Sequence, residues 1–243
     1  MNYTAVRLCI SPVLLSMSSI AVAQGDIACE LPAEIFGATY QIARQSVEGG
    51  AVEAETVAAE TEKLVLLRSA NKVMHIHPMR NTADVWERNA HGGVHFSRFY
   101  DSHQRGIEFY QGVVAEPASR LNWDQAYQLL PAAVMSENQV QSVRERPGCA
   151  NVESYRYTVE GDAYTLEWLP AQQLVLRLVV DRGQYRMSWT LQSVEAQPDR
   201  LSEEIQQREA YITIDYADIG DQESDAFFRS LHHGSARHDA AHH

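Results

Sequence analysis

Apolar and polar residues alternate with a period of two over most of the chain after residue 34. The alternation is clearest from 155 to 191, where every second position carries Tyr, Val, Leu, Trp or Met. Turn residues interrupt it at Gly161-Asp162 and at Asp181-Arg182-Gly183. Because side chains alternate between the two faces of a strand, this pattern predicts four antiparallel strands in a meander with one buried face.

The first half of the chain contains shorter alternating runs that also end at turn residues. Residues 52–62 fit either a helix, by their Ala and Glu content, or a strand, by their surroundings. The clearer runs predict five further strands, over residues 63–68, 72–77, 83–88, 94–100 and 106–110.

Helical signals are few and short. In "NWDQAYQLLP", Asn122 can cap a helix that Pro131 ends. A second short helix is expected after Ser224, with Phe228 and Leu231 facing inward. The predicted fold class is mostly β, either a curved antiparallel sheet or a half-barrel built as a meander, with a few short helices.

The first 23 residues have the pattern of a secretory signal peptide. Arg7 is their only charged residue, and the uncharged stretch that follows ends in Ala21-Val22-Ala23. Small residues at these positions are typical of a cleavage site, and the apolar stretch is short for a membrane span. We expect cleavage near Ala23 and a mature protein that is periplasmic or secreted, with no membrane-spanning segment.

The remaining chain divides by composition into two parts. We expect an antiparallel β domain over residues 24–215, followed by a tail over 216–243 that is first acidic and then rich in histidine. The formal net charge is −12, and loss of Arg7 with the leader changes it to about −13. Such a surface repels phosphate backbones, so nucleic acid is excluded as a partner.

Cys29 and Cys149 are the only cysteines left once the leader with Cys9 is removed. In an oxidising compartment two cysteines have one possible pairing, so we predict a disulfide. The closed loop would exceed a hundred residues, which by loop entropy corresponds to a stabilisation of roughly 4 to 5 kcal/mol. A metal site built on the two thiolates is the alternative.

The stretch "VMHIHP" places His75 and His77 on one face of a predicted strand and Met74 and Ile76 on the other. We expect Met74 and Ile76 to pack inward and the two histidines to face water.

A metal site is the alternative role for these two histidines. Asp84 would lie opposite His75 in the next strand, which forms a His-His-Asp trio without a clear fourth ligand. His95, placed opposite Arg88, would lie more than about 10 Å from His75.

The C-terminal tail is a second candidate metal site. Neutral imidazoles at high density bind Zn²⁺, Cu²⁺ or Ni²⁺ even without a preformed pocket, since a flexible segment can wrap the ion. A solvated tail with incidental affinity is the alternative. The candidate ligands are His232, His233, His238, His242 and His243.

Catalytic signatures are absent from the chain, which favours a binding protein over an enzyme. There is no G-x-S-x-G, S-x-x-K or HExxH motif and no Gly-rich phosphate loop. Aromatic residues at strand period either form the core or line an apolar pocket. The candidates for ligand contact are Tyr155, Tyr157, Tyr164, Trp168 and Trp189.

The stretch "YRYTVEGDAYTLEWLPAQQLVLRLVV", with its strand–turn–strand pattern ending in Trp168-Leu169-Pro170, resembles the periplasmic lipoprotein carriers of the LolA/LolB-like class. The resemblance is architectural, covers residues 30–215, and includes no motif that would assign a residue role. It implies a half-open barrel covered by helices, with acyl chains held on the concave face. The His-rich tail and the single disulfide depart from that class.

These patterns favour a periplasmic carrier for an apolar ligand, such as a lipid or an acylated protein, over an enzyme. One alternative is a periplasmic protein that binds a divalent metal through the tail. The other is an accessory subunit of an envelope assembly, with a face or edge of the sheet presented to a protein partner.

Deletion of residues 232–243 should remove most of the divalent-metal affinity and leave the fold intact, because only small or polar residues separate these histidines. Binding should weaken below about pH 6, since a protonated imidazole has no lone pair to donate. Titration of Cu²⁺ or Zn²⁺ into the full-length, truncated and His75→Ala proteins measures both effects. Full affinity in the truncated protein would place the site outside the tail.

Overall fold

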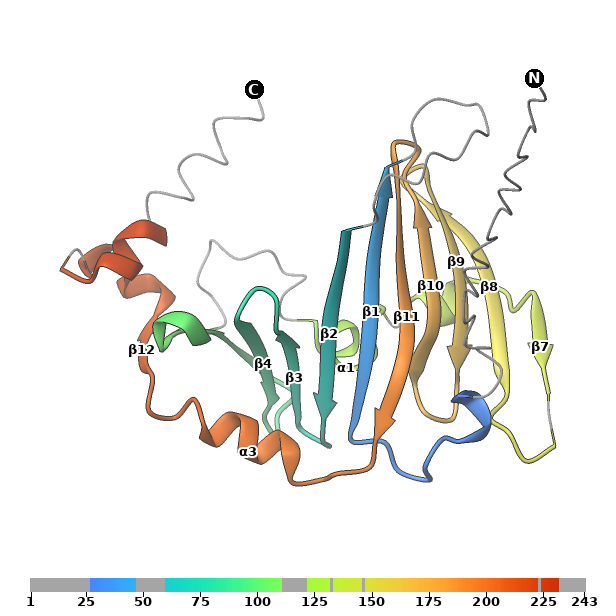
Figure 1. Cartoon of the computed structure of the whole chain (residues 1–243), viewed down its shortest axis with the longest axis horizontal. Helices are drawn as coiled ribbons and strands as arrows, with labels where there is room; N and C mark the ends of the chain where they lie inside the picture. The colour runs from blue at the N-terminus through green and yellow to red at the C-terminus, as the bar shows by residue number, and fades with distance from the viewer. Residues whose placement is uncertain are drawn as a thin grey trace, which may run out of the picture.

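The computed structural model describes residues 27–46, 60–110, 122–131, 133–145, 147–222 and 224–231. Within these ranges the chain forms one sheet of 12 strands and a few short helices (Figure 1). The predicted fold class, mostly β with an antiparallel meander and few short helices, is confirmed. The sheet is open, with β12 and β7 at its opposite edges, and it does not curl into the predicted half-barrel.

The strands follow the alternating runs of the sequence closely. Two predicted runs, 72–77 and 94–100, coincide with strands, and the last three residues of the ambiguous segment 52–62 begin a strand. In chain order the strands are β1 (Gly37–Ser46), β2 (Glu60–Arg68), β3 (Lys72–His77), β4 (Thr82–Arg88), β5 (Val94–Tyr100), β6 (Arg105–Phe109), β7 (Ser142–Arg144), β8 (Val152–Val159), β9 (Asp162–Leu169), β10 (Leu174–Asp181), β11 (Tyr185–Glu195) and β12 (Ile212–Asp215).

The helices are short, and none in the described ranges has the length and apolarity needed to cross a membrane. The predicted cap is confirmed, because the side chain of Asn122 accepts a hydrogen bond from the backbone N–H of Gln125 at 3.1 Å. The helices are α1 (Trp123–Gln128), α2 (Ala133–Glu137) and α3 (Arg200–Gln206), with 3₁₀ turns η1 (Ile27–Cys29), η2 (Asp101–His103) and η4 (Tyr216–Asp221).

β1 joins two meanders into one sheet. β2 to β6 form the first and β7 to β11 the second, and β1 pairs antiparallel with β2 on one side and with β11 on the other. Glycine at the first residue of β1 avoids close contacts, because a Cβ on Gly37 would lie 2.8 Å from a methyl group of Leu67 and 3.3 Å from the carbonyl oxygen of Leu66. β12 adds to the free side of β6 as a parallel strand.

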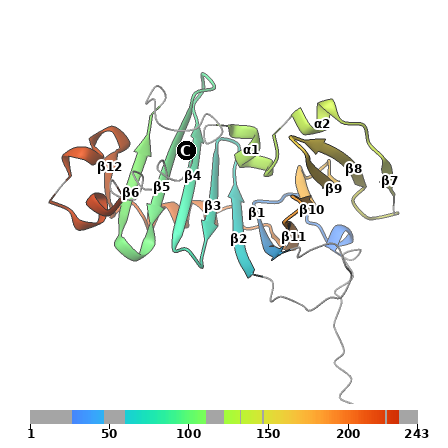
Figure 2. The ribbon, with the colours of Figure 1, turned by 90° about the horizontal axis from the view of Figure 1, so that it is seen from above.

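The two faces of the sheet are covered by different helices. The face that carries Tyr40, His75 and Trp189, here the α1 face, packs against α1 and α2, which lie on the same side of the sheet (Figure 2). The opposite face, here the α3 face, packs Met74 and Ile76 against α3. Both faces of β2 to β4 are therefore buried, and the prediction that Met74 and Ile76 pack inward is confirmed.

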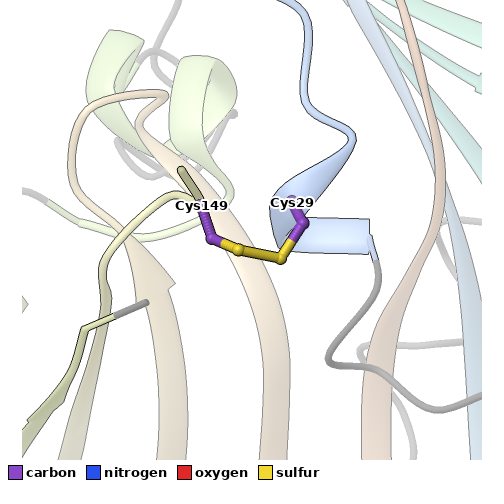
Figure 3. Close-up of a disulfide and its surroundings, with 2 residues drawn as sticks. All are labelled: Cys29 and Cys149. Carbon is purple, nitrogen blue, oxygen red and sulfur yellow. A yellow bond between two sulfur atoms is a disulfide. The ribbon is translucent and has the colours of Figure 1, made fainter. Parts of the chain in front are cut away.

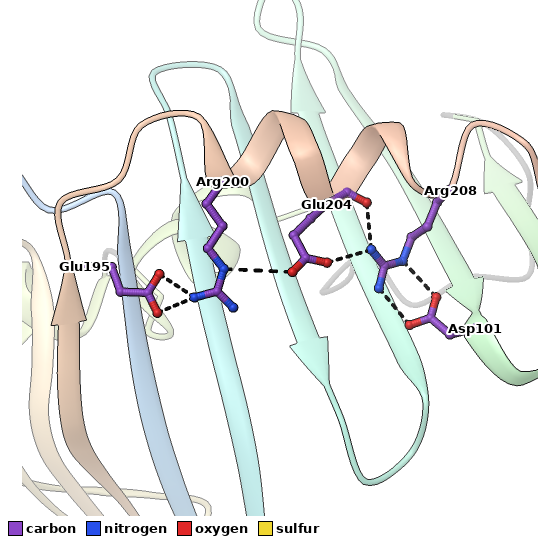
Figure 4. Close-up of polar contacts among 5 residues, drawn as sticks. All are labelled: Asp101, Glu195, Arg200, Glu204 and Arg208. Carbon is purple, nitrogen blue, oxygen red and sulfur yellow. Dashed lines mark hydrogen bonds and ion pairs between the residues drawn. The ribbon is translucent and has the colours of Figure 1, made fainter.

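α3 crosses the α3 face and is fixed at both ends by ion pairs (Figure 4). Arg200 pairs with Glu195 at the end of β11. Arg208 donates to both oxygens of Asp101 at 2.8 and 2.7 Å, and to Glu204 at 3.0 Å. Arg208 is buried, so loss of its carboxylate partners would leave an unpaired charge away from water. The ion pairs of Arg208 therefore cost more free energy to break than the pair between Arg200 and Glu195.

The packed structure extends beyond the boundary predicted at residue 215. Tyr216 in η4 stacks on Phe109 of β6, with ring centroids 5.0 Å apart. A helical turn over 226–231 follows, in which Phe228 is buried, as predicted, and Asp225 just before it pairs with Arg105 at 3.0 Å. The edge of the sheet at β6 and β12 is therefore covered by the acidic part of the segment expected to be a tail.

Cys29 and Cys149 form the predicted disulfide (Figure 3). Cys29 ends η1, just before β1, and Cys149 lies in the loop that precedes β8. The backbone N–H of Ala150 also donates to the carbonyl of Ala28 at 2.9 Å. The cross-link therefore fastens the segment that leads into β1 to the second meander, 120 residues away in sequence.

Reduction of this disulfide should lower the free energy of unfolding by about 2 to 5 kcal/mol, because the unfolded chain regains the freedom of a long loop. Urea unfolding with and without reductant measures the difference. The Cys29→Ser/Cys149→Ser protein should unfold at the lower urea midpoint under both conditions. A wild-type midpoint unaffected by complete reduction would contradict the expectation.

Candidate functional site

The five aromatic candidates lie on the α1 face. The register pairs Tyr155 with Leu166, Tyr157 with Tyr164, and Leu178 with Trp189, so that these side chains form rows across β8 to β11. Three strands of the second meander, β8, β9 and β11, thus place the candidates on a common surface.

Their surroundings divide these residues into core and cavity wall. Trp168 and Tyr155 are buried in the main core, at 4% and 3% exposure. Tyr157 and Tyr164 stack with ring centroids 4.8 Å apart, and burial raises the pKa of Tyr157 to about 12. Tyr155 also borders a hollow of about 600 Å³ lined mostly by polar side chains. Of the five, Trp189 alone contributes to a second, larger cavity beneath α1.

This cavity has a volume of about 770 Å³ and lies between α1 and the α1 face. Strands of both meanders form its floor, together with β1 between them. Ala126 of α1 and Leu129, the residue that follows the helix, form its cover. The apolar part of the floor consists of Ile42, Leu64, Trp86, Val175, Leu178, Met187 and Trp189.

A hydrogen-bonded group of three polar residues lines part of the cavity. Glu62 of β2 accepts hydrogen bonds from two residues: His77 at 3.0 Å through Nδ1, and Arg80 at 2.6 Å. Glu62 and His77 are mostly buried, at 17% and 19% side-chain exposure, whereas Arg80 is 65% exposed. The sequence analysis missed Glu62 and Arg80, since their proximity arises only when β2 and β3 pair.

His75 lies beneath α1, so the prediction that both histidines face water is wrong for this residue. Its Nε2 lies 2.7 Å from the carbonyl oxygen of Ala126, and its ring centroid lies 4.6 Å from that of Trp86. Burial lowers the pKa of His75 to about 4, against a smaller opposing effect of the hydrogen bond to Ala126. The physical reason for the error is that helices cover both faces of β3.

The His-His-Asp trio is not available for a metal. Asp84 does lie opposite His75, as predicted, but both of its oxygens accept hydrogen bonds from Arg98 at 2.6 Å. This hydrogen bonding also raises the pKa of Arg98. Within the described ranges no group of three or more potential ligands could hold a metal ion.

His95 lies on the opposite face from His75. The sequence analysis placed His95 opposite Arg88, but the register pairs it with Glu87. Asn89 explains the shift: its side chain accepts from the backbone N–H groups of His91 and Gly93 at 2.9 Å, which tightens the turn by one residue. A slip of one residue moves every side chain of a strand to the other face.

Arg68 holds α1 and the β9–β10 turn against the sheet. Its guanidinium donates to the carbonyl oxygens of Tyr127 at 3.3 Å and Gln173 at 2.9 Å, and lies 4.7 Å from the centre of the Tyr127 ring. The residue is buried, and burial lowers its pKa. The sequence signal for this residue is a single Arg that ends the apolar run "LVLL", which the analysis treated only as the end of a strand.

The predicted signal peptide and the five tail histidines lie outside the described residues. Cleavage near Ala23 and metal binding at His232, His233, His238, His242 and His243 therefore stay predictions.

Comparison with known proteins adds no family. No family model and no curated protein matches the chain. Among solved structures the chain is similar to a structure of PNGF-II in the P21 space group. The sequence identity is 13% and the TM-score 0.35, over 76% of this chain and 32% of that one. For a structure of PNGF-II in the C2 space group, the identity is 12% and the TM-score 0.36, over 73% of this chain and 31% of that one. The chain spans about a third of the length of these structures.

His75 should make the free energy of unfolding fall as the pH is lowered from about 6.5 to 4. The unfolded chain takes up this proton near pH 6.5, and the folded protein does so near pH 4. Between these values the unfolded state binds more protons, so acid destabilises the fold, by about 2 to 3 kcal/mol in total. Urea unfolding at a series of pH values measures the slope.

Two variants isolate this effect from the titration of carboxyl groups. His75→Gln should lose less stability than the wild type between pH 6.5 and 4. His91→Gln, at an exposed position in the β4–β5 turn, should keep the wild-type slope. Identical slopes for wild type and His75→Gln would show that His75 titrates normally.

Proposed function

We propose that this protein binds an apolar ligand, such as the acyl chain of a lipid or of an acylated protein, in the cavity between α1 and the sheet. The observation that carries the proposal is the cavity itself. Its volume of about 770 Å³ lies within the range of roughly 300 to 1,000 Å³ that is usual for small-molecule sites. An apolar floor with a few polar groups is also the usual composition of such sites.

The position of the cavity supports a carrier more than an enzyme. The resemblance to lipoprotein carriers implies that acyl chains lie on one face of a sheet beneath helices, and the cavity lies between α1 and the α1 face. The polar residues of its wall include a histidine paired with a carboxylate, His77 with Glu62. Among the described residues of this wall there is no serine or cysteine that could act as a nucleophile.

The cell envelope is the compartment that we propose for this binding. The sequence supports this through the signal-peptide pattern of residues 1–23. The disulfide between Cys29 and Cys149 is compatible with an oxidising compartment. An apolar ligand that moves between membranes needs a cover from water, which the cavity beneath α1 would provide.

The mature protein should bind 1,6-diphenylhexatriene, an apolar probe without hydrogen-bonding groups, in a saturable way. Trp86 and Trp189 line the cavity, so energy transfer from tryptophan to the probe reports on binding there. Met187→Lys should weaken binding about tenfold or more, because a charge would enter the apolar floor.

Ser188→Lys provides the matched control. Ser188 follows Met187 in β11 and lies on the α3 face, so the same new charge stays outside the cavity. This variant should bind the probe as the wild type does. Equal losses in both variants, or no saturable binding by the wild type, would argue against the proposed site.

A further inference from the structure

Two histidines, one carboxylate and one amide form the partly buried polar part of the cavity wall. These are His75, His77, Glu62 and Asn122. The cations that also line the cavity, Arg44 and Arg80, are exposed and therefore belong to its rim. The hydrogen-bonding preference of the partly buried wall therefore depends on which nitrogen of each imidazole carries the proton.

The contact with α1 fixes the tautomer of His75. A carbonyl oxygen only accepts hydrogen bonds, so the 2.7 Å contact between Nε2 and Ala126 O requires a proton on Nε2. The lowered pKa, about 4, keeps the ring neutral at pH 7. In a neutral ring Nδ1 then carries a lone pair and acts as an acceptor. Among the described residues, none donates a hydrogen bond to this Nδ1.

His77 follows the same rule with the opposite nitrogen. A carboxylate accepts, so the 3.0 Å contact between Nδ1 and Glu62 Oε1 places the proton on Nδ1. The proton on Nδ1 is therefore committed to Glu62. Because His75 and His77 are two residues apart in β3, both rings belong to the same face of the sheet.

We infer that the cavity selects apolar ligands that carry a hydrogen-bond donor, an alcohol or an N–H group, over ligands that carry acceptors alone. This inference rests on the proposed function, since it concerns the same cavity. The apolar body of the ligand would contact Leu178 and Trp189, and its donor would bind Nδ1 of His75. An ether or carboxylate oxygen there would face the lone pair of Nδ1 and leave that nitrogen without a donor, which is unfavourable.

Competition between two matched ligands tests this selection. Dodecan-1-ol and dodecyl methyl ether each displace diphenylhexatriene from the mature wild-type protein at pH 7. The ether is the more apolar of the two, so without selection it binds at least as tightly. With selection the alcohol binds about 3- to 10-fold more tightly, the ratio expected for one net hydrogen bond.

Two variants assign the selection to His75. His75→Leu should bind both ligands and lose the preference for the alcohol. His75→Gln can still donate to Ala126 and accept from the ligand, so it should keep the preference. A preference that survives in His75→Leu would overturn the assignment.

The outcomes separate this inference from the proposed function. Saturable binding of diphenylhexatriene with equal affinity for the alcohol and the ether would overturn the selection and leave the apolar site standing. No binding of diphenylhexatriene by the wild type would overturn both.

Discussion

The pairing of β1 with both β2 and β11 is the constraint on which the rest of the structure depends. Each meander forms from neighbours in sequence, so it needs only short turns. The pairing of Gly37 with Glu195 joins residues that most of the chain separates, and its loop-closure entropy is correspondingly large. The disulfide from Cys29, just before β1, opposes this entropy by keeping the segment near the second meander in the unfolded chain.

Contacts across this joint hold the cavity together. Ile42 of β1 lies between Trp189 of β11 and Glu62 of β2 in one row of the α1 face, so the floor exists only when β1 pairs on both sides. Tyr40, one step along the strand, is fully buried, and burial raises its pKa. On the other face, α3 crosses the same joint from Glu195 to Asp101, so that bending of the sheet there would break ion pairs.

Local alternation predicted most of the fold because each strand carries its own pattern. The residues 72–77 alone were enough to predict β3. The side chain of Asn122 alone was enough to predict a helix cap. Non-local relations escaped the same reasoning. One partner of β1 is β11, which lies at the far end of the β domain. The face on which His95 lies depended on the length of the β4–β5 turn, which Asn89 shortens by one residue.

The candidate site shows why such patterns locate strands better than functions. In "MHIH" the two apolar residues lie on one face of the strand and the two histidines on the other, and a polar face is expected to contact water. Burial of His75 depends instead on α1, which is encoded about 50 residues later in the chain and is held over β3 by Arg68. α1 is only 6 residues long, so it covers His75 and Trp86 but leaves the floor beside Met187 and Trp189 unfilled. A helix long enough to cover that floor would replace the cavity with core. The limited length of α1 is thus what leaves a cavity above the apolar floor, the site that we propose for a ligand.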